Sequence, residues 1–106
     1  MEIKVGGTKK PVYTKYKVAA INYNVQIYRK EENIANQYAM VEEAAKNGAK
    51  LIAIPEMGTT GYCWYDREEV KPFIEPIPGP TTDKFLTLAK QYDCYIAVAM
   101  PEVDPK

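Results

Sequence analysis

The sequence LIAIPEMGTTGY, residues 51–62, contains the features that best indicate the fold. Its first four residues are apolar without interruption, which predicts a core strand over residues 50–55 with both faces covered. Pro55 ends this strand, and Glu56 follows directly. Because ligands bind beyond the carboxyl ends of strands in open parallel α/β sheets, we expect Glu56 at the rim of a site, partly removed from water. A carboxylate there can act as a general base; a cap on a loop or an ion pair with a lysine is the alternative.

The loop after this strand combines two glycines with aromatic residues. Gly58 and Gly61 allow the backbone to approach a ligand closely, whereas Tyr62 and Trp64 supply rigid aromatic surface. A loop of this kind over a strand end suits a small-molecule pocket, so both aromatic residues are candidates for substrate binding. The alternative is a packed Ω-loop whose aromatic side chains only hold it against the core.

The segment before residue 50 predicts one more strand and one long helix. Residues 17–24 contain a short apolar run that is typical of a strand. Apolar residues at helical spacing predict a helix over residues 30–47, which Gly48 ends in the left-handed conformation. The apolar residues expected on one face of this helix are Ile34, Tyr38, Val41 and Ala45.

The second half of the chain predicts a further helix and strand. A helix over residues 83–92 is capped by Thr81 or Thr82, and a strand follows over residues 95–100. A short helix around residues 67–73 interrupts the preceding connection, and the run PIPGP at residues 76–80 excludes regular structure there. The order strand–helix–strand–loop–helix–strand implies right-handed crossovers and a largely parallel sheet.

Composition excludes several kinds of chemistry. The 106 residues contain 14 basic and 14 acidic side chains, so net charge gives no reason to expect nucleic acid or a membrane surface as partner. No apolar run reaches the ~20 residues that span a bilayer, and no signal-peptide core is present, which makes the cytoplasm the expected location. The absence of histidine excludes a Ser-His-Asp triad and a His-ligated metal site within the chain, and two cysteines are too few for a thiolate site.

These features together resemble the N-terminal part of the nitrilase superfamily of carbon–nitrogen hydrolases. Residues 51–62 resemble its first signature, an apolar strand that ends in Pro-Glu and leads to Gly-Tyr. The resemblance covers residues 17–106, but only about the first third of the family's fold; residues 1–16 are then an N-terminal extension, in which residues 12–16 could form an edge strand. The other segments that match are the helix with Asn33, the turn at 47–49, the helix entry at 77–82 and the strand end at Pro101-Glu102.

The resemblance implies a fold and a reaction. The family has an α-β-β-α sandwich, of which three core strands and two main helices would lie here, and a Glu-Lys-Cys triad that cleaves amides, nitriles or N-carbamoyl compounds without a cofactor or metal. Glu56 matches the Glu; the Lys and the nucleophilic Cys lie outside this chain. Cys63 lies in the wrong motif and is expected to be a pocket wall or a packed thiol. The chain alone is therefore expected to be inactive and to need the remainder of the domain or another subunit, in an enzyme that we expect to be a homo-oligomer.

Two other functions are consistent with the residues. The chain could be a non-catalytic remnant or interaction module that retains the first part of the fold. An unrelated nucleotide-binding α/β domain is the third hypothesis, although neither a Gly-x-Gly-x-x-Gly motif nor a P-loop follows the first strand. In each case three strands leave a sheet edge open, which predicts contact with further protein.

Overall fold

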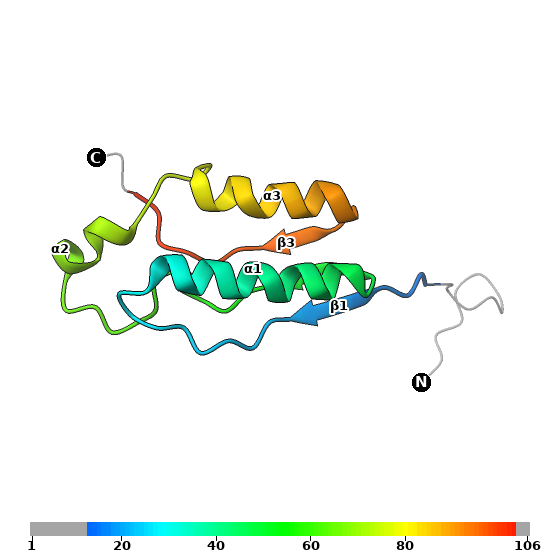
Figure 1. The fold of residues 1–106 in the computed structure, drawn as a ribbon, viewed down its shortest axis with the longest axis horizontal. Helices are drawn as coiled ribbons and strands as arrows, with labels where there is room; N and C mark the ends of the chain where they lie inside the picture. Colours follow the sequence, from blue (N-terminus) through cyan, green and yellow to red (C-terminus); the bar gives the residue numbers. More distant parts are fainter. Residues whose placement is uncertain (1–12, 104–106) are drawn as a thin grey trace, which may run out of the picture.

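A three-stranded parallel sheet organises residues 13–103, the part of the chain that the computed structural model describes (Figure 1). In chain order the elements are β1 (Lys17–Ala20), α1 (Lys30–Lys46), β2 (Ala49–Ala53), α2 (Arg67–Val70), the 3-10 helix η1 (Lys71–Phe73), α3 (Pro80–Tyr92) and β3 (Tyr95–Ala97). The strands pair in the order β1-β2-β3, so β2 is central, as expected for two right-handed crossovers whose helices lie on the same face of the sheet. The predicted element order and parallel pairing are confirmed.

Both long helices pack on one face of the sheet. Ile52 of β2 is completely buried on that face, and its register partners Ala19 and Ile96 pack against the same core. The helices also contact each other, since the rings of Tyr38 in α1 and Phe85 in α3 have centroids 5.9 Å apart. The buried apolar residues that form the core are Ile34, Val41, Ala45, Ala49, Ile52, Ile54, Phe85 and Leu88. The apolar face predicted for α1 is therefore largely correct, with Tyr38 half-buried at its edge.

The opposite face of the sheet is uncovered within the described residues. Val18, Leu51 and Tyr95 form one row across the three strands, and their exposed fractions are 68%, 48% and 80%. The expectation that residues 51–54 are covered on both faces is thus wrong for this part of the chain. Continuous apolar sequence indicates that a strand is suited to two-sided burial, but the covering layer must come from other residues.

Element ends differ from prediction where local side chains compete with the backbone. α1 ends at Lys46 and Gly48 has φ +90°, as predicted. α3, however, begins at Pro80 with Gly79 as its N-cap, because proline at the first helical position needs no hydrogen-bond partner for its nitrogen. Thr82 lies inside the first turn instead, where its Oγ1 accepts from Gly79 N at 2.7 Å and donates to Gly79 O at 3.0 Å.

Strands β1 and β3 are shorter than predicted, although their backbones continue alongside β2. Ile21 N donates to Ala53 O at 2.8 Å beyond the end of β1. Beyond β3, Gly58 N donates to Ala99 O at 2.9 Å. Residues 13–16 form no strand, and the rest of the predicted extension, residues 1–12, lies outside the described part of the chain.

Candidate active site

The carboxyl ends of the strands open onto a pocket of about 500 Å³. The arrowheads of β1 and β3 in Figure 1 point to the end of the molecule where α2 lies. The residues that line the pocket are Tyr23, Asn24, Val25, Gln26, Ile27, Glu56, Gly61 and Tyr62. Among these described lining residues Glu56 is the only one with a charged side chain, and the rest offer amide, phenol and aliphatic groups to a ligand.

Glu56 begins the turn that follows β2, and the backbone of this turn is held at several points. Gly61 N donates to Met57 O at 2.8 Å, which closes the turn, and Met57 adopts φ +52° to allow this bend. Gly58 N is tied to the segment beyond β3. The Glu56 side chain is exposed, whereas we had expected it to be partly removed from water. The turn projects beyond the sheet, so its carboxylate reaches the pocket rather than the core.

Tyr62 is the side chain that contacts the Glu56 carboxylate. Its hydroxyl is hydrogen-bonded to Glu56, and this bond, with smaller contributions from burial and from the negative charge, raises the pKa of Tyr62 above its ordinary value. A phenol that stays protonated remains a donor to the carboxylate and can fix its orientation. The structure therefore brings together two of the three residues that the sequence predicted for the site.

Trp64, the third predicted site residue, does not line this pocket. Its indole nitrogen donates to Gly61 O at 2.8 Å. Its ring packs against those of Tyr28 and Phe73, with centroids 5.2 and 5.3 Å away. This arrangement resembles the packed loop that we gave as the alternative for the aromatic residues. Trp64 holds Gly61, which does line the pocket, so it contacts the site through the backbone.

Residues 23–27 are the part of the pocket that sequence reasoning missed. The strand predicted over residues 17–24 ends among them, but nothing local shows that the chain then turns back along the Glu56 turn. Asn33 of α1 holds them there, because it hydrogen-bonds both to Gln26 and to Thr59, which lies 26 residues later in the chain. No signal in the sequence marks this contact, because Asn33 is buried only by the tertiary structure.

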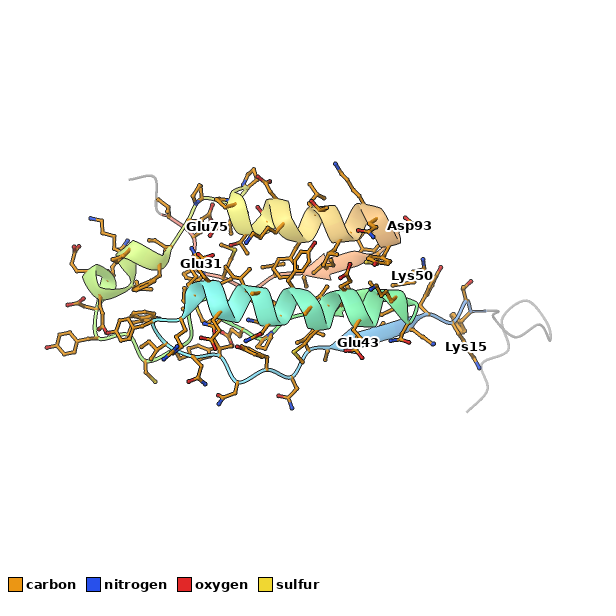
Figure 2. All side chains as sticks on the ribbon, in the orientation of Figure 1. Lys15, Glu31, Glu43, Lys50, Glu75 and Asp93 are labelled. Atoms are coloured by element: carbon orange, nitrogen blue, oxygen red, sulfur yellow. The ribbon has the colours of Figure 1, made fainter. Side chains whose placement is uncertain are left out.

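A buried carboxylate, Glu75, was also missed. Figure 2 shows it at the end of the molecule where α1 begins, opposite Lys50 and Asp93. Lys30 Nζ lies 2.7 Å from its Oε2, and Thr81 donates to it twice, from N at 2.6 Å and from Oγ1 at 2.8 Å. Burial alone raises the pKa of Glu75, but Lys30 and the Thr81 donors outweigh that and hold the pKa below its ordinary value. Glu75 thereby joins the starts of α1 and α3.

The remaining candidates lie away from this pocket lining. Cys63 is exposed with φ +70° and does not line the pocket, so the expectation of a pocket wall or a packed thiol is wrong. Glu102 is exposed and pairs through its backbone with Glu75. Within residues 13–103, no three His, Cys, Asp or Glu side chains are grouped as a metal ion would need. None of the helices in these residues is both long and apolar enough to cross a bilayer.

The family model described as carbon-nitrogen hydrolase matches residues 17–106. The chain belongs to the carbon–nitrogen hydrolase family. This membership removes the hypothesis of an unrelated nucleotide-binding domain. It also confirms the resemblance that residues 51–62 suggested.

Relatives in the carbon–nitrogen hydrolase family include nitrilases and amidases. A nitrilase of Pyrococcus abyssi is 36% identical over 89 residues, which are 83% of this chain and 34% of the relative. An omega-amidase of Homo sapiens is 29% identical over 92 residues, which are 86% of this chain and 32% of the relative. The chain thus spans about a third of the length of these two relatives.

A solved structure supports the fold. The crystal structure of an N-terminal amidase superposes with a TM-score of 0.73 at 24% identity, over 85% of this chain and 22% of that one. The three strands and two long helices are therefore part of a carbon–nitrogen hydrolase fold. At this level of identity the likeness concerns the fold and not the substrate.

Proposed function

We propose that this chain supplies the general base, Glu56, of an enzyme that hydrolyses non-peptide carbon–nitrogen bonds. The observation that carries the proposal is the position of Glu56 in a family member: it lies at the end of the central strand, exposed to a pocket and oriented by Tyr62. The exposed carboxylate can therefore be reached by a substrate or a nucleophile from the pocket. The proposed substrates are amides, nitriles or N-carbamoyl compounds.

The reaction follows from the chemistry of a Glu-Lys-Cys triad, in which the lysine and cysteine come from outside these 106 residues. Glu56 accepts the proton of the thiol as sulfur bonds to the amide carbon, and the lysine stabilises the negative oxygen that forms. Glu56 then returns the proton to the departing amine, which leaves a thioester. Water, deprotonated by Glu56, cleaves the thioester and releases the acid and the free thiol.

The uncovered face of the sheet supports the need for further protein. A row of Val18, Leu51 and Tyr95 exposes a large apolar area on a strand surface that is otherwise suited to packing. We propose that the remainder of the hydrolase domain covers this face, as the second sheet of the sandwich would. A homo-oligomer and a cytoplasmic location stay predictions.

The same exposed face favours the second candidate function, a non-catalytic interaction module. In that case the apolar row would bind a partner that lacks the other triad residues. The two candidates differ in what the natural protein contains and in what it does to a substrate. The mass of the natural protein and its hydrolytic activity can be measured on one preparation.

The test is to purify the natural protein that carries this segment and to measure its mass and its release of ammonia or acid. A mass well above that of 106 residues, or a co-purifying fragment with the rest of the domain, together with hydrolysis of at least one of the three substrate classes, would support the proposal. Residues 1–106 alone should show no hydrolysis and should self-associate through the apolar row. A folded natural protein with no hydrolysis of any class would favour the interaction module.

A further inference from the structure

Two fully buried amide side chains lie on α1 close to the pocket. Asn33 and Gln37 are both 0% exposed, and they lie one helical turn apart. Gln37 Nε2 donates to the main-chain oxygen of Asn33 at 2.9 Å, so the two residues are also connected. Burying an amide is unfavourable unless its polar atoms find partners. The partners of these two residues therefore indicate their role.

Asn33 joins the two walls of the pocket. Its Oδ1 accepts from Gln26 N at 2.9 Å, and its Nδ2 donates to Gln26 O at 2.7 Å, which is the pattern of a backbone pairing. The same Nδ2 donates to Thr59 O at 3.1 Å. Gln26 lines the pocket on one side, and Thr59 belongs to the turn that Glu56 begins. One side chain thus fixes the separation of the two segments.

Gln37 of α1 contacts the same turn at Gly58. Its Nε2 donates to Gly58 O at 2.5 Å. A Cβ atom added to Gly58 would lie 2.8 Å from Gln37 Oε1, so the backbone of the turn rests directly on this amide. The turn that presents Glu56 is therefore in contact with α1 at two successive residues, 58 and 59.

The contacts between this turn and α1 leave two buried polar atoms unpaired. Gln37 Oε1 and Thr59 Oγ1 are both buried without a hydrogen-bond partner among residues 13–103. An unpaired buried polar atom costs about 1–3 kcal/mol. An apolar side chain of similar size at residue 37 would remove the unpaired Oε1, but it would also remove the donor to Gly58 O. Amides at these positions are explained by the geometry that they impose on the turn.

We propose that Asn33 and Gln37 are positioning residues of the hydrolase, which hold the Glu56 turn at a set distance from the wall formed by residues 24–27. The inference rests on the proposed function, because it assigns these residues a role in a reaction that Glu56 carries. Neither side chain lines the pocket, so both act through the backbone. A displacement of about 1 Å in such a turn can slow an enzyme about 10²-fold.

The decisive variant is Asn33→Asp in the complete hydrolase. It keeps the acceptor for Gln26 N but replaces the Nδ2 donor with an oxygen, which repels the carbonyl oxygens of Gln26 and Thr59. We expect kcat to fall about 10²-fold under conditions in which circular dichroism shows the variant to be fully folded. The matched control is Asn47→Asp, at the C-cap that ends α1, where the side-chain amide donates to Glu43 O at an exposed position. The kcat of this control should change less than about twofold.

A spectroscopic measurement separates positioning from simple loss of stability. The pKa of Tyr62 is raised by its hydrogen bond to Glu56, so displacement of the turn should return that pKa toward its ordinary value. Nuclear magnetic resonance of labelled tyrosine should show this change in Asn33→Asp and not in Asn47→Asp. If Asn33→Asp melts earlier but keeps both the Tyr62 titration and kcat per folded molecule, the inference is wrong.

Gln37→Met provides a second test if Asn33→Asp does not fold. The thioether has similar length, removes the unpaired Oε1 and cannot donate to Gly58 O. We expect a folded protein whose kcat falls about tenfold, and an unchanged kcat would contradict the inference. Glu56→Gln distinguishes the two proposals: if that variant keeps its turnover, the proposed function fails, whereas loss only in Glu56→Gln leaves the function intact and removes the positioning role.

Discussion

Glu56 and Glu75 both lie beyond the carboxyl ends of the strands, but in opposite surroundings. Glu75 is 7% exposed, and Lys30 and Thr81 occupy both of its oxygens. Glu56 is exposed, and the contact found for it in the described chain is the Tyr62 hydroxyl. The fold therefore buries the Glu75 carboxylate and leaves the Glu56 carboxylate exposed at the pocket.

The difference teaches that burial and availability are separate properties of a candidate catalytic carboxylate. A search for buried carboxylates with shifted pKa values would find Glu75 first, yet its partners leave no room for a reacting group. The Pro-Glu motif indicates Glu56, whose side chain is exposed and lines the pocket. The comparison therefore predicts that substitution of Glu56 lowers turnover, whereas substitution of Glu75 lowers stability.

The largest effect is expected from Glu56→Gln in the complete hydrolase. Glutamine keeps the size and the contact with Tyr62 but cannot accept a proton, so kcat should fall about 10²–10⁴-fold. The unfolding midpoint should change little, because the side chain is exposed. Steady-state kinetics and thermal unfolding on the same preparation test both statements. A lower midpoint with unchanged activity per folded molecule would reverse the roles of the two glutamates.

Glu75→Gln should show the opposite pattern. It weakens the contact with Lys30 and replaces a charged acceptor for Thr81, so we expect the free energy of unfolding to fall by about 1–3 kcal/mol. Turnover per folded molecule should stay within about threefold of the original. Chemical denaturation and kinetics below the unfolding temperature check this. A large loss of kcat in a fully folded Glu75→Gln protein would contradict the comparison.

The acid stability of the two variants should also differ. The pKa of Glu75 is held below its ordinary value of 4.5, so its stabilising contribution is complete above that pH and is lost as the pH falls through the lowered value. Urea unfolding from about pH 7 down to about pH 3 should therefore show a shallower loss of stability in Glu75→Gln than in the original or in Glu56→Gln. If the three proteins lose stability in parallel as the pH falls, Glu75 does not contribute to the pH dependence of stability.

The smallest effect is expected from Cys63→Ala. Cys63 is exposed and lies outside the pocket lining, although it is only seven residues from Glu56. Turnover of the complete hydrolase should stay within about twofold of the original. A loss comparable with that of Glu56→Gln would make Cys63 part of the reaction and would remove the need for a nucleophile from outside this chain.

Periodic and local features of this sequence were sufficient to predict its elements. The apolar spacing from Ile34 to Ala45 predicted α1, Gly48 predicted its end, and the run LIAI before Pro55 predicted β2 and the location of Glu56. These features depend on residues within a turn or two of one another, where the period of a helix or strand is directly visible. The helix start at Pro80 was misplaced by a few residues because threonine and glycine can both cap a helix.

Only the tertiary structure decided which polar side chains are enclosed and which face of the sheet is open. Asn33, Gln37 and Glu75 look like ordinary surface residues in the sequence, and each is buried by segments far along the chain. Tyr95 and Leu51 look like core residues, yet their face has no cover among residues 13–103. The physical reason is the same in both cases: a side chain is buried or exposed according to what packs against it, and that partner is set by long-range contacts rather than by its neighbours in sequence.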